Sequence, residues 1–305
     1  MFINTYFITP LKGLRAQVAS IIEKEARYLN NNGKKRVSHF IKGFKVLDLF
    51  DKEGSMILKS FYFWARFIDD VIDRDRKHIL SNDIKGFIEE KKHFLAGVAQ
   101  KHASFREIHD EQDLLLIYAY RAAKEILKID IMDSAFKIFE TMEYDFQRSK
   151  AAVFPLTSEL NDYFDKLDIT SIYEALRIMN ESGITKEDLE GLNQATRLRY
   201  TVRDLVEDIS NNIYNISQEE LIAYNIKPEE FSNAKSFEEL WLNPRIHRWI
   251  DNNTTKIFLG LKRSRQALRG KKIKLKTRLA LFLCFKLPCR LALIKWGLKL
   301  YILSD

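Results

Sequence analysis

Two pairs of aspartates with the same spacing are the residues of this sequence best placed to do chemistry. They are Asp69 with Asp73 and Asp204 with Asp208, four residues apart in each pair. On a helix, residues four apart project from the same side, so each pair would present two carboxylates together. Arg66 stands one helical turn before the first pair, and Arg203 directly precedes the second. Each motif therefore combines paired carboxylates with a cation.

The residues around the first pair predict that its helix is buried. Between Phe61 and Ile72 large apolar side chains leave almost no polar face, and a helix that is apolar nearly all round lies inside a protein. Buried carboxylates are costly unless they are paired or bind a metal, and Mg²⁺ prefers oxygen ligands. The alternative is a surface helix whose aspartates form ion pairs with Arg66, Arg74 and Arg76.

The second pair favours a metal site, because two acidic helices could face each other across one cavity. Mg²⁺ is commonly held by a few carboxylates together with substrate phosphates. The four aspartates are therefore the predicted metal ligands and catalytic groups, and the two arginines are predicted to bind a diphosphate. For the second motif, the alternative is an ion pair between Arg203 and Glu207 on a solvated helix face.

Long helices with short connections are predicted to carry these motifs. Glycine (11) and proline (5) are scarce, which favours an all-α protein over a β-sandwich or a chain of linked domains. Hydrophobic spacing predicts helices over 14–30, 36–50, 56–72, 83–99, 111–150, 186–213, 217–225 and 236–250, with a break at 52–55. We find no repeat and no linker, so residues 1–305 are predicted to form a single domain, with an N-terminal helix within 1–35.

Positive charge is concentrated towards the C-terminus. The net charge is +8 with a pI near 9.2, and a basic cluster occupies residues 260–299. No aromatic residues are interleaved among 260–278, so the cluster does not favour nucleic acid. The tail 279–305 is apolar with a cation every four or five residues and is interrupted by Pro288, which argues against a spanning helix. It fits either a packed helix with a solvated basic face or a helix lying on a membrane surface.

The cysteines and the N-terminus bear on the cellular compartment. Cys284 and Cys289 are the two cysteines, without zinc-type spacing or a disulfide framework, so a reducing compartment is the default. Residues 1–12 lack a basic segment followed by an uninterrupted apolar run, so no signal peptide is expected. We therefore expect a cytoplasmic protein, with the tail as a candidate contact to the inner face of a membrane.

With both motifs identified, the chain resembles the squalene/phytoene synthase family of trans-isoprenyl diphosphate synthases, as a divergent member. Residues 64–73 (WARFIDDVID) resemble the family's first aspartate motif with its preceding arginine, and residues 203–208 (RDLVED) resemble the second. The resemblance covers roughly residues 36–290. It implies a helical bundle of the isoprenoid synthase type around a central cavity.

Weaker matches follow in the family's order. Ser38 lies in a stretch that resembles an N-terminal element touching diphosphate, and residues 142–146 resemble a methionine-aspartate segment. Tyr163 fits a substrate-contacting tyrosine on the helix that opens at Thr157, and Arg278 lies in a stretch similar to the family's C-terminal basic element. By resemblance, Tyr163 is a candidate catalytic residue, and Ser38 and Arg278 are candidate diphosphate contacts.

The chain departs from the family's pattern near the expected cavity. The departures are Asp168, Ile169 and Ile172 in place of small residues at a helix kink, Arg197 and Tyr200 in place of a glutamine and an asparagine near the substrate, and Asn211-Asn212 in place of a glycine-arginine or glutamate-arginine pair. Arg197 and Tyr200 are therefore candidate substrate contacts. These changes affect the expected product more than the ionisation chemistry.

The resemblance implies a Mg²⁺-dependent transferase of isoprenoid biosynthesis. It would join two prenyl diphosphates, C15 or C20, head to head through a cyclopropyl intermediate, with two or three Mg²⁺ ions. No GxGxxG fingerprint is present, so no NADPH-dependent step is expected. The alternatives are a terpene cyclase acting on one prenyl diphosphate, which Arg197, Tyr200 and Ile169 would favour, a non-enzymatic protein of this fold, and a basic helical nucleic-acid-binding protein.

Overall fold

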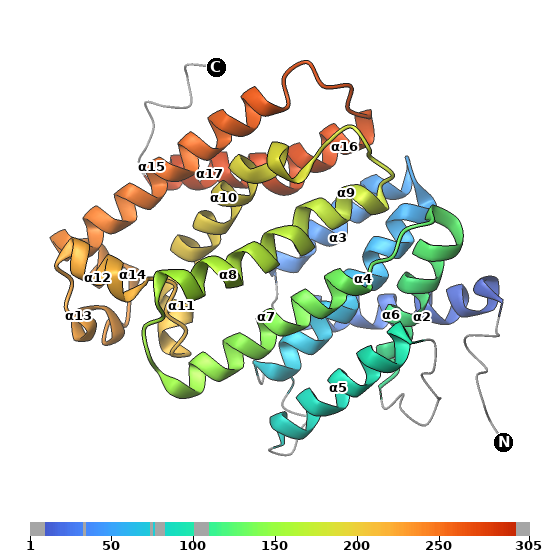
Figure 1. The fold of residues 1–305 in the computed structure, drawn as a ribbon, viewed down its shortest axis with the longest axis horizontal. Coiled ribbons are helices and arrows are strands. Elements are labelled where there is room, and N and C mark those ends of the chain that lie inside the picture. Colours follow the sequence, from blue (N-terminus) through green and yellow to red (C-terminus); the bar gives the residue numbers. More distant parts are fainter. Residues whose placement is uncertain (1–9, 33–34, 74–75, 77–82, 101–109, 297–305) are drawn as a thin grey trace. The chain divides into compact units, whose positions relative to one another are not determined.

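The computed structural model describes residues 10–32, 35–73, 76, 83–100 and 110–296 (Figure 1). Within these residues every regular element is a helix, which confirms the all-α fold class. The helices group into two compact units, one of residues 1–143 and 174–181 and one of residues 144–173 and 182–305. The two acidic motifs fall in different units, and the single-domain organisation stays a prediction.

The first unit contains the first acidic motif on a buried helix. Its helices are α2 (Leu11–Asn31), α3 (Lys35–Asp48), α4 (Lys52–Ile72), α5 (Ile84–Ala99), α6 (Asp113–Ala122), the π-helical turn η2 (Ala123–Leu127), the first part of α7 (Met132–Ala151) and α9 (Glu174–Ile178). Helix α4 packs against α2, α3 and α6. Trp64, Phe67 and Ile68 on α4 are fully buried. This burial confirms that the first motif lies on an almost wholly apolar helix and does not fit a surface helix.

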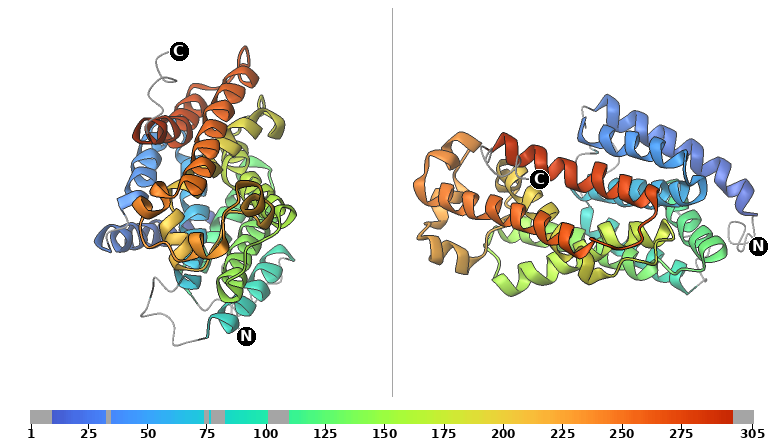
Figure 2. Two further views of the ribbon diagram at one scale, coloured as in Figure 1. Left: turned by 90° about the vertical axis from the view of Figure 1, so that its left-hand side faces the viewer. Right: turned by 90° about the horizontal axis from the view of Figure 1, so that it is seen from above.

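The second unit contains the second acidic motif and the C-terminal basic segment. Its helices are the last part of α7, α8 (Thr157–Asp168), the π-helical turn η3 (Ile169–Tyr173), α10 (Lys186–Arg203), α11 (Leu205–Ser210), α12 (Gln218–Tyr224), α13 (Pro228–Ser232), α14 (Phe237–Leu242), α15 (Pro244–Ala267), α16 (Leu275–Ala280), the π-helical segment η4 (Leu281–Lys286) and α17 (Leu287–Lys295). Helix α15 packs along α10 and beside α17, and Figure 2 shows the orange α15 next to the red α17 from two further directions.

The predicted helix boundaries differ from the structure at four places for a local reason, and α15 also continues to Ala267, beyond the predicted end at residue 250. Residues 52–55 are the first turn of α4 instead of a break, because the Asp51 side chain caps the helix by accepting the Gly54 N–H at 2.9 Å. The helix predicted over 111–150 is broken at Lys128, which has a left-handed backbone with φ of 60°. Residues 186–213 form two helices that meet at Asp204. The helix over 236–250 is split at Asn243, whose side chain caps α15.

Pro288 does not interrupt the C-terminal helix as the sequence predicts. It lies in the first turn of α17, where a missing N–H is tolerated. The six residues before α17 form the wider π-helical segment η4, and the residues on either side of the junction, Lys286 and Leu287, both have right-handed helical backbones. The path from Leu275 to Lys295 is therefore one continuous helical stretch with a local change of pitch.

Two glycines allow α10 and α15 to approach each other closely. A Cβ atom added to Gly191 would lie 2.6 Å from the carbonyl oxygen of Gly260, and the converse contact has the same length. Both obstructing atoms belong to backbone, so they cannot move aside as the end of a flexible side chain would. The helix that ends in the second acidic motif is therefore fixed against α15 by backbone packing.

We expect Gly191→Ala to lower the free energy of unfolding by about 1 to 3 kcal/mol, the usual cost of overpacking a close contact. Gly270→Asn is the matched control. Gly270 has φ of 78° with nothing within 4 Å of its added Cβ, and asparagine tolerates that backbone. It should cost less than about 1 kcal/mol. Urea unfolding of both variants measures the difference, and equal costs would contradict the close-packing explanation.

Candidate functional site

The first aspartate pair lies at the C-terminal end of α4. Asp69 is in the last turn of the helix, and Asp73 follows it as the capping residue, with its N–H donated to the Asp69 carbonyl at 2.9 Å. The Asp69 side chain is 33 % exposed, and Asp73 is exposed. A helix C-terminus carries partial negative charge, so carboxylates placed there are stabilised by a nearby cation. The predicted pair is therefore accessible and electronegative.

Arg66 supplies part of this positive charge. Its Nη1 donates to Asp69 Oδ2 at 2.7 Å, and its Nη2 forms a closer ion pair with Asp70. Burial alone would lower the pKa of Arg66, but Asp69 and Asp70 outweigh it and raise the pKa. Arg66 is thus a permanently charged group held against Asp69 and Asp70.

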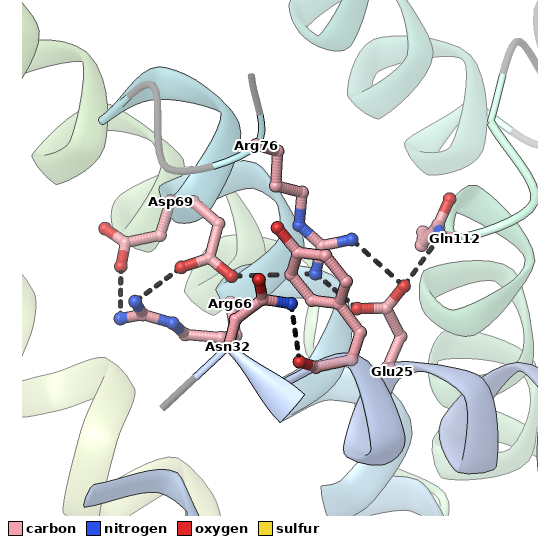
Figure 3. Close-up of polar contacts among 8 residues, drawn as sticks. Glu25, Asn32, Arg66, Asp69, Arg76 and Gln112 are labelled. Carbon is pink, nitrogen blue, oxygen red and sulfur yellow. Dashed lines mark hydrogen bonds and ion pairs between the residues drawn. The ribbon is translucent and has the colours of Figure 1, made fainter. Parts of the chain in front are cut away.

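Asp70 belongs to a buried ionic network that the spacing argument did not find. Its side chain is fully buried and pairs with Arg66 and, at 3.5 Å, with Arg76. Arg76 in turn forms a close ion pair with Glu25 of α2, and Gln112 Nε2 donates to Glu25 Oε1 at 2.8 Å. Figure 3 shows Glu25 between Arg76 and Gln112, with Arg66 and Asp69 on the other side of Arg76. The network joins α2, α4 and the start of α6.

The second aspartate pair is placed by a break between two helices. Asp204 separates α10 from α11 with φ of −97° and ψ of 5°, although the Asp208 N–H still donates to the Asp204 carbonyl at 2.8 Å. Arg203 holds both oxygens of Asp204, with Nε at 2.8 Å from Oδ1. Its guanidinium also lies 4.4 Å from the centroid of the Tyr200 ring. Direct contacts of Arg203 therefore hold Tyr200 and Asp204 together.

The pKa of Asp208 is strongly raised. Burial, followed by the charge of Asp204, raises its pKa from 3.8 to about 8. Asn215 Nδ2 donates to Asp208 Oδ2 at 2.9 Å and opposes this shift. Near neutral pH without a bound cation, Asp208 therefore retains its proton.

The replacement at Asn212 has a backbone reason. Asn212 adopts a left-handed conformation with φ of 57°, which asparagine tolerates better than most residues. The following N–H, of Ile213, donates to the Asp208 carbonyl at 2.8 Å and closes the helix end. The chain then turns back, so that Asn215 reaches the carboxyl group of Asp208.

Three further groups lie close to the second pair, and only Tyr163 was among the predicted site residues. Tyr163 donates its hydroxyl proton to Asp145 at 2.9 Å, and Arg148 Nε donates to the same carboxylate at 2.7 Å. Burial and then Asp145 raise the pKa of Tyr163, and Asp208 contributes to the same shift. Burial also raises the pKa of Asp145. Tyr163 is therefore a protonated hydrogen-bond donor beside a cluster of carboxyl groups.

The donor set of the second motif fits Mg²⁺. Asp145 and Asp204 both raise the pKa of Asp208 through their charge, and carboxylate oxygens are the ligands that Mg²⁺ prefers. Within the part of the chain that the structure describes, no three His, Cys, Asp or Glu side chains are gathered as a ready-made metal cage. Mg²⁺ typically uses only one or two carboxylates and completes its shell with water and phosphate. Asp204 and Asp208 are the residues of this unit that would hold it.

Two of the departures from the family's pattern contact each other. Arg197 Nη1 of α10 lies 3.4 Å from Asp168 Oδ2 at the end of α8, and both side chains are 17 % exposed. Burial raises the pKa of Asp168 to about 6, and Arg197 opposes that shift. The Arg197 guanidinium also lies 4.8 Å from the centroid of the Phe164 ring. The two unusual residues, Asp168 and Arg197, therefore compensate each other's charge.

The helix changes pitch directly after this pair, at η3. The structure therefore has a local irregularity where the resemblance implies a kink, but it forms without a glycine. Ile172 within η3 is buried, and the side chain of Ile169 lies outside the described residues.

We expect Arg197→Gln to destabilise the protein more than the double change Asp168→Ala with Arg197→Gln. Removal of Arg197 leaves the Asp168 carboxyl in a poorly solvated position, whereas removal of both groups leaves no buried charge. The coupling energy from the double-mutant cycle should be about 1 kcal/mol at pH 7.5, where Asp168 is ionised, and smaller at pH 5. Additive effects at both pH values would contradict the pairing.

The remaining predicted residues are not brought to either motif by the described contacts. Ser38 lies in α3, but its side chain lies outside the described residues. Arg278 is exposed on α16, in the C-terminal basic segment. The prediction that the two acidic helices face each other stays a prediction.

Comparison with known proteins adds no assignment. No protein-family model matches the chain, and no curated protein matches it significantly in sequence. The case for a function therefore depends on the geometry of the two motifs and on the resemblance of their residues.

Proposed function

We propose that this chain is a Mg²⁺-dependent transferase of the squalene/phytoene synthase type, which ionises allylic prenyl diphosphates and joins two of them head to head. The observation that carries the proposal is the cluster of carboxyl groups in the second unit, where Asp204 and Asp145 lie close enough to Asp208 to act on it through their charge, beside the hydrogen bonds that Tyr163 and Arg148 donate to Asp145. Carboxyl groups held together against their repulsion bind a cation strongly, because the cation relieves that repulsion.

The arginines supply the second requirement of the reaction, positive charge for a leaving diphosphate. Mg²⁺, when bound, would neutralise part of the diphosphate and relieve the repulsion among the aspartates. Arg66 and Arg203 are paired with carboxylates of their own motifs. Arg66 and Arg203 would donate to diphosphate oxygens as the C–O bond breaks, if metal held the carboxylates with which they now pair.

The contacts of Tyr163 support this proposal in the second unit. Its hydroxyl donates to Asp145 and stays protonated, and its ring lies 4.8 Å from the Arg148 guanidinium. Arg148 is itself fixed by Asp145 and by the Tyr214 carbonyl at 3.1 Å. This arrangement keeps a hydrogen-bond donor and a cation in fixed positions beside Asp208.

One observation favours a second candidate, the cyclisation of a single prenyl diphosphate. The Asp168–Arg197 pair places charge where the resembled family keeps small or uncharged residues. A charged pair in that place would shorten or reshape the space for a second prenyl chain. The same aspartates would ionise the substrate in either reaction.

Product analysis separates the two candidates. Purified protein with Mg²⁺ is incubated with C10, C15 or C20 allylic diphosphates, singly and in pairs, and the organic extract is analysed by mass spectrometry. We expect a condensed product of two prenyl chains. A cyclised product of one chain would establish the second candidate, and the absence of any product together with unchanged substrate would contradict both.

A further inference from the structure

The helical stretch from Leu275 to Lys295 has one face packed into the second unit. Thr277, Leu281, Cys289 and Leu293 are at most 2 % exposed. Cys289 and Leu293 form a small core with residues of α10 and α15, Ala195 and Ile257. The stretch is therefore an integral part of the second unit, held in place by its buried side.

The other face of the same stretch combines large apolar side chains with cations. We call it the basic apolar face; it consists of Leu275, Arg278, Phe282, Leu283, Lys286, Arg290, Leu291, Ile294 and Lys295. Its apolar members are exposed, from 39 % for Leu283 to 65 % for Leu275. Apolar groups of this size exposed together on a rigid helix indicate a surface that contacts another apolar phase.

The part of the chain that carries this face is strongly basic. Residues 252–304 contain fourteen Lys and Arg residues and no Asp or Glu. Because the whole chain has a net charge of +8, the remainder carries a net negative charge. Burial, with the nearby charges of Arg290 and of Arg265 on α15, lowers the pKa of Lys286. Cations from two helices are thus crowded together, and an anionic surface would relieve that crowding.

We propose that the basic apolar face binds the surface of a lipid bilayer that contains anionic headgroups. The cations would contact phosphate groups, while Phe282, Leu283, Leu291 and Ile294 would enter the boundary of the acyl chains, as in helices that lie in a membrane interface. No helix among the described residues is long and apolar enough to cross a membrane.

A nucleic acid is the other polyanion that such a charge would attract, but the apolar members of the face argue for lipid. Single-stranded nucleic acid is bound by aromatic rings that stack on bases, whereas the exposed apolar side chains here are mainly leucine and isoleucine. Branched aliphatic side chains gain little from contact with phosphate and ribose. They gain substantially from transfer into hydrocarbon. The proposal is independent of the proposed enzymatic activity.

Vesicle co-sedimentation tests the proposal with the full chain. We expect the protein to pellet with vesicles of equimolar phosphatidylglycerol and phosphatidylcholine, and not with phosphatidylcholine alone. Arg290→Gln with Lys295→Gln should reduce the partition coefficient about 30-fold, at the usual contribution of each basic residue near an anionic surface. Phe282→Ser with Leu283→Ser should also weaken binding, and the binding that remains should be lost at high salt.

Matched controls keep the test specific. Ile222→Ser with Leu242→Ser removes two apolar side chains of the same unit, 80 % and 72 % exposed, and should leave binding unchanged. Lys235→Gln removes an exposed cation elsewhere in the unit and should have little effect. If the variants of the face bind as wild type does, or if a single-stranded RNA competes the protein off the vesicles and binds more tightly, the proposal is overturned.

A second measurement does not depend on folding of the variants. Trypsin cleaves after Arg278, Arg290 and Lys295, three cations of the basic apolar face. Anionic vesicles should slow cleavage of the wild-type chain at these sites and leave cleavage after Lys235 unchanged. Equal cleavage rates at all sites with and without vesicles would contradict the proposed face.

Discussion

Replacement of Asp208 by asparagine is expected to remove most of the Mg²⁺-dependent activity while stabilising the metal-free protein at neutral pH. Asn retains the shape of the side chain but cannot supply the negative charge that holds Mg²⁺. We expect kcat/KM for diphosphate release to fall by about 10²- to 10³-fold, as for the loss of one electrostatic contact to a transition state. The matched control is Asp162→Asn in the same unit, whose side chain is 71 % exposed.

The stability effect follows from the sign of the pKa shift. The pKa of Asp208 is about 8 in the folded chain, against an ordinary value of 3.8. The folded state therefore holds this proton more tightly than the unfolded state, and stability falls as pH rises from about 4 to 8. Asp113 and Asp168 have pKa values raised to about 6, so the effect of Asp208 is separated from theirs above pH 6.

Urea unfolding in EDTA between pH 6 and 8 measures this effect. Wild-type stability should decline across the range, and Asp208→Asn should show a smaller decline. The apparent affinity of the wild-type protein for Mg²⁺ should rise over the same range, because protons and the metal compete for one carboxyl group. Parallel stability curves for the two proteins would contradict the assigned pKa of Asp208.

Replacement of Arg76 by alanine is expected to have the largest effect on stability. Arg76 is 4 % exposed and pairs with both Glu25 and Asp70. Its guanidinium also lies 4.3 Å from the Tyr28 ring centroid and 4.8 Å from that of Phe67. Loss of one partner from a buried ionic group costs about 3 to 5 kcal/mol, because uncompensated charges remain inside. We expect the free energy of unfolding to fall by this amount.

An exposed arginine on α2, the helix that also carries Glu25, provides the control. Arg27 is 72 % exposed and lies 4.0 Å from Glu23, so Arg27→Ala should change stability by less than about 0.5 kcal/mol. A cost below about 1 kcal/mol for Arg76→Ala would show that the network is not an important source of stability. A second readout is Mg²⁺ affinity, which should weaken in Arg76→Lys, because a single ammonium cannot hold Glu25 and Asp70 as a guanidinium does.

The sequence predicted the fold class because the relevant signals are local. Hydrophobic spacing and the scarcity of glycine and proline are properties of short segments, and they located most helices within a few residues. Two of the errors arose where one residue changes the direction of the backbone. Lys128 in a left-handed conformation and Asp204 at a helix junction have no distinctive residue type, so hydrophobic periodicity continues across both.

Spacing along one helix predicted part of the candidate site, but not the contacts that come from other segments. Helical spacing selected Asp69 and Asp73 and passed over Asp70, since adjacent residues point in different directions. Asp70 pairs with the nearby Arg66 and Arg76, but the rest of the network comes from distant segments, as Glu25 is 51 residues from Arg76 and 87 from Gln112. Such contacts are made by tertiary packing and leave no periodic signal.

The second motif shows the same limit on a shorter scale. Asp145 and Arg148 are three residues apart on α7, a spacing that could have indicated an ion pair. Their bond with Tyr163 and the approach of Asn215 to Asp208 depend on how the chain turns between helices. The charge environment that raises the pKa of Asp208 could therefore be recognised only in the folded chain.

Diphosphate release is the most direct test of the central claim that these aspartates assist ionisation. Wild-type protein is mixed with a C15 or C20 allylic diphosphate, with Mg²⁺ or with EDTA, and released diphosphate is measured. The variants are Asp69→Asn and Asp208→Asn, with Asp133→Asn and Asp162→Asn as controls at side chains 75 % and 71 % exposed. We predict Mg²⁺-dependent release that is lost in the first two variants and retained in the controls. No release by the wild type, or release that survives both site substitutions, would contradict the claim.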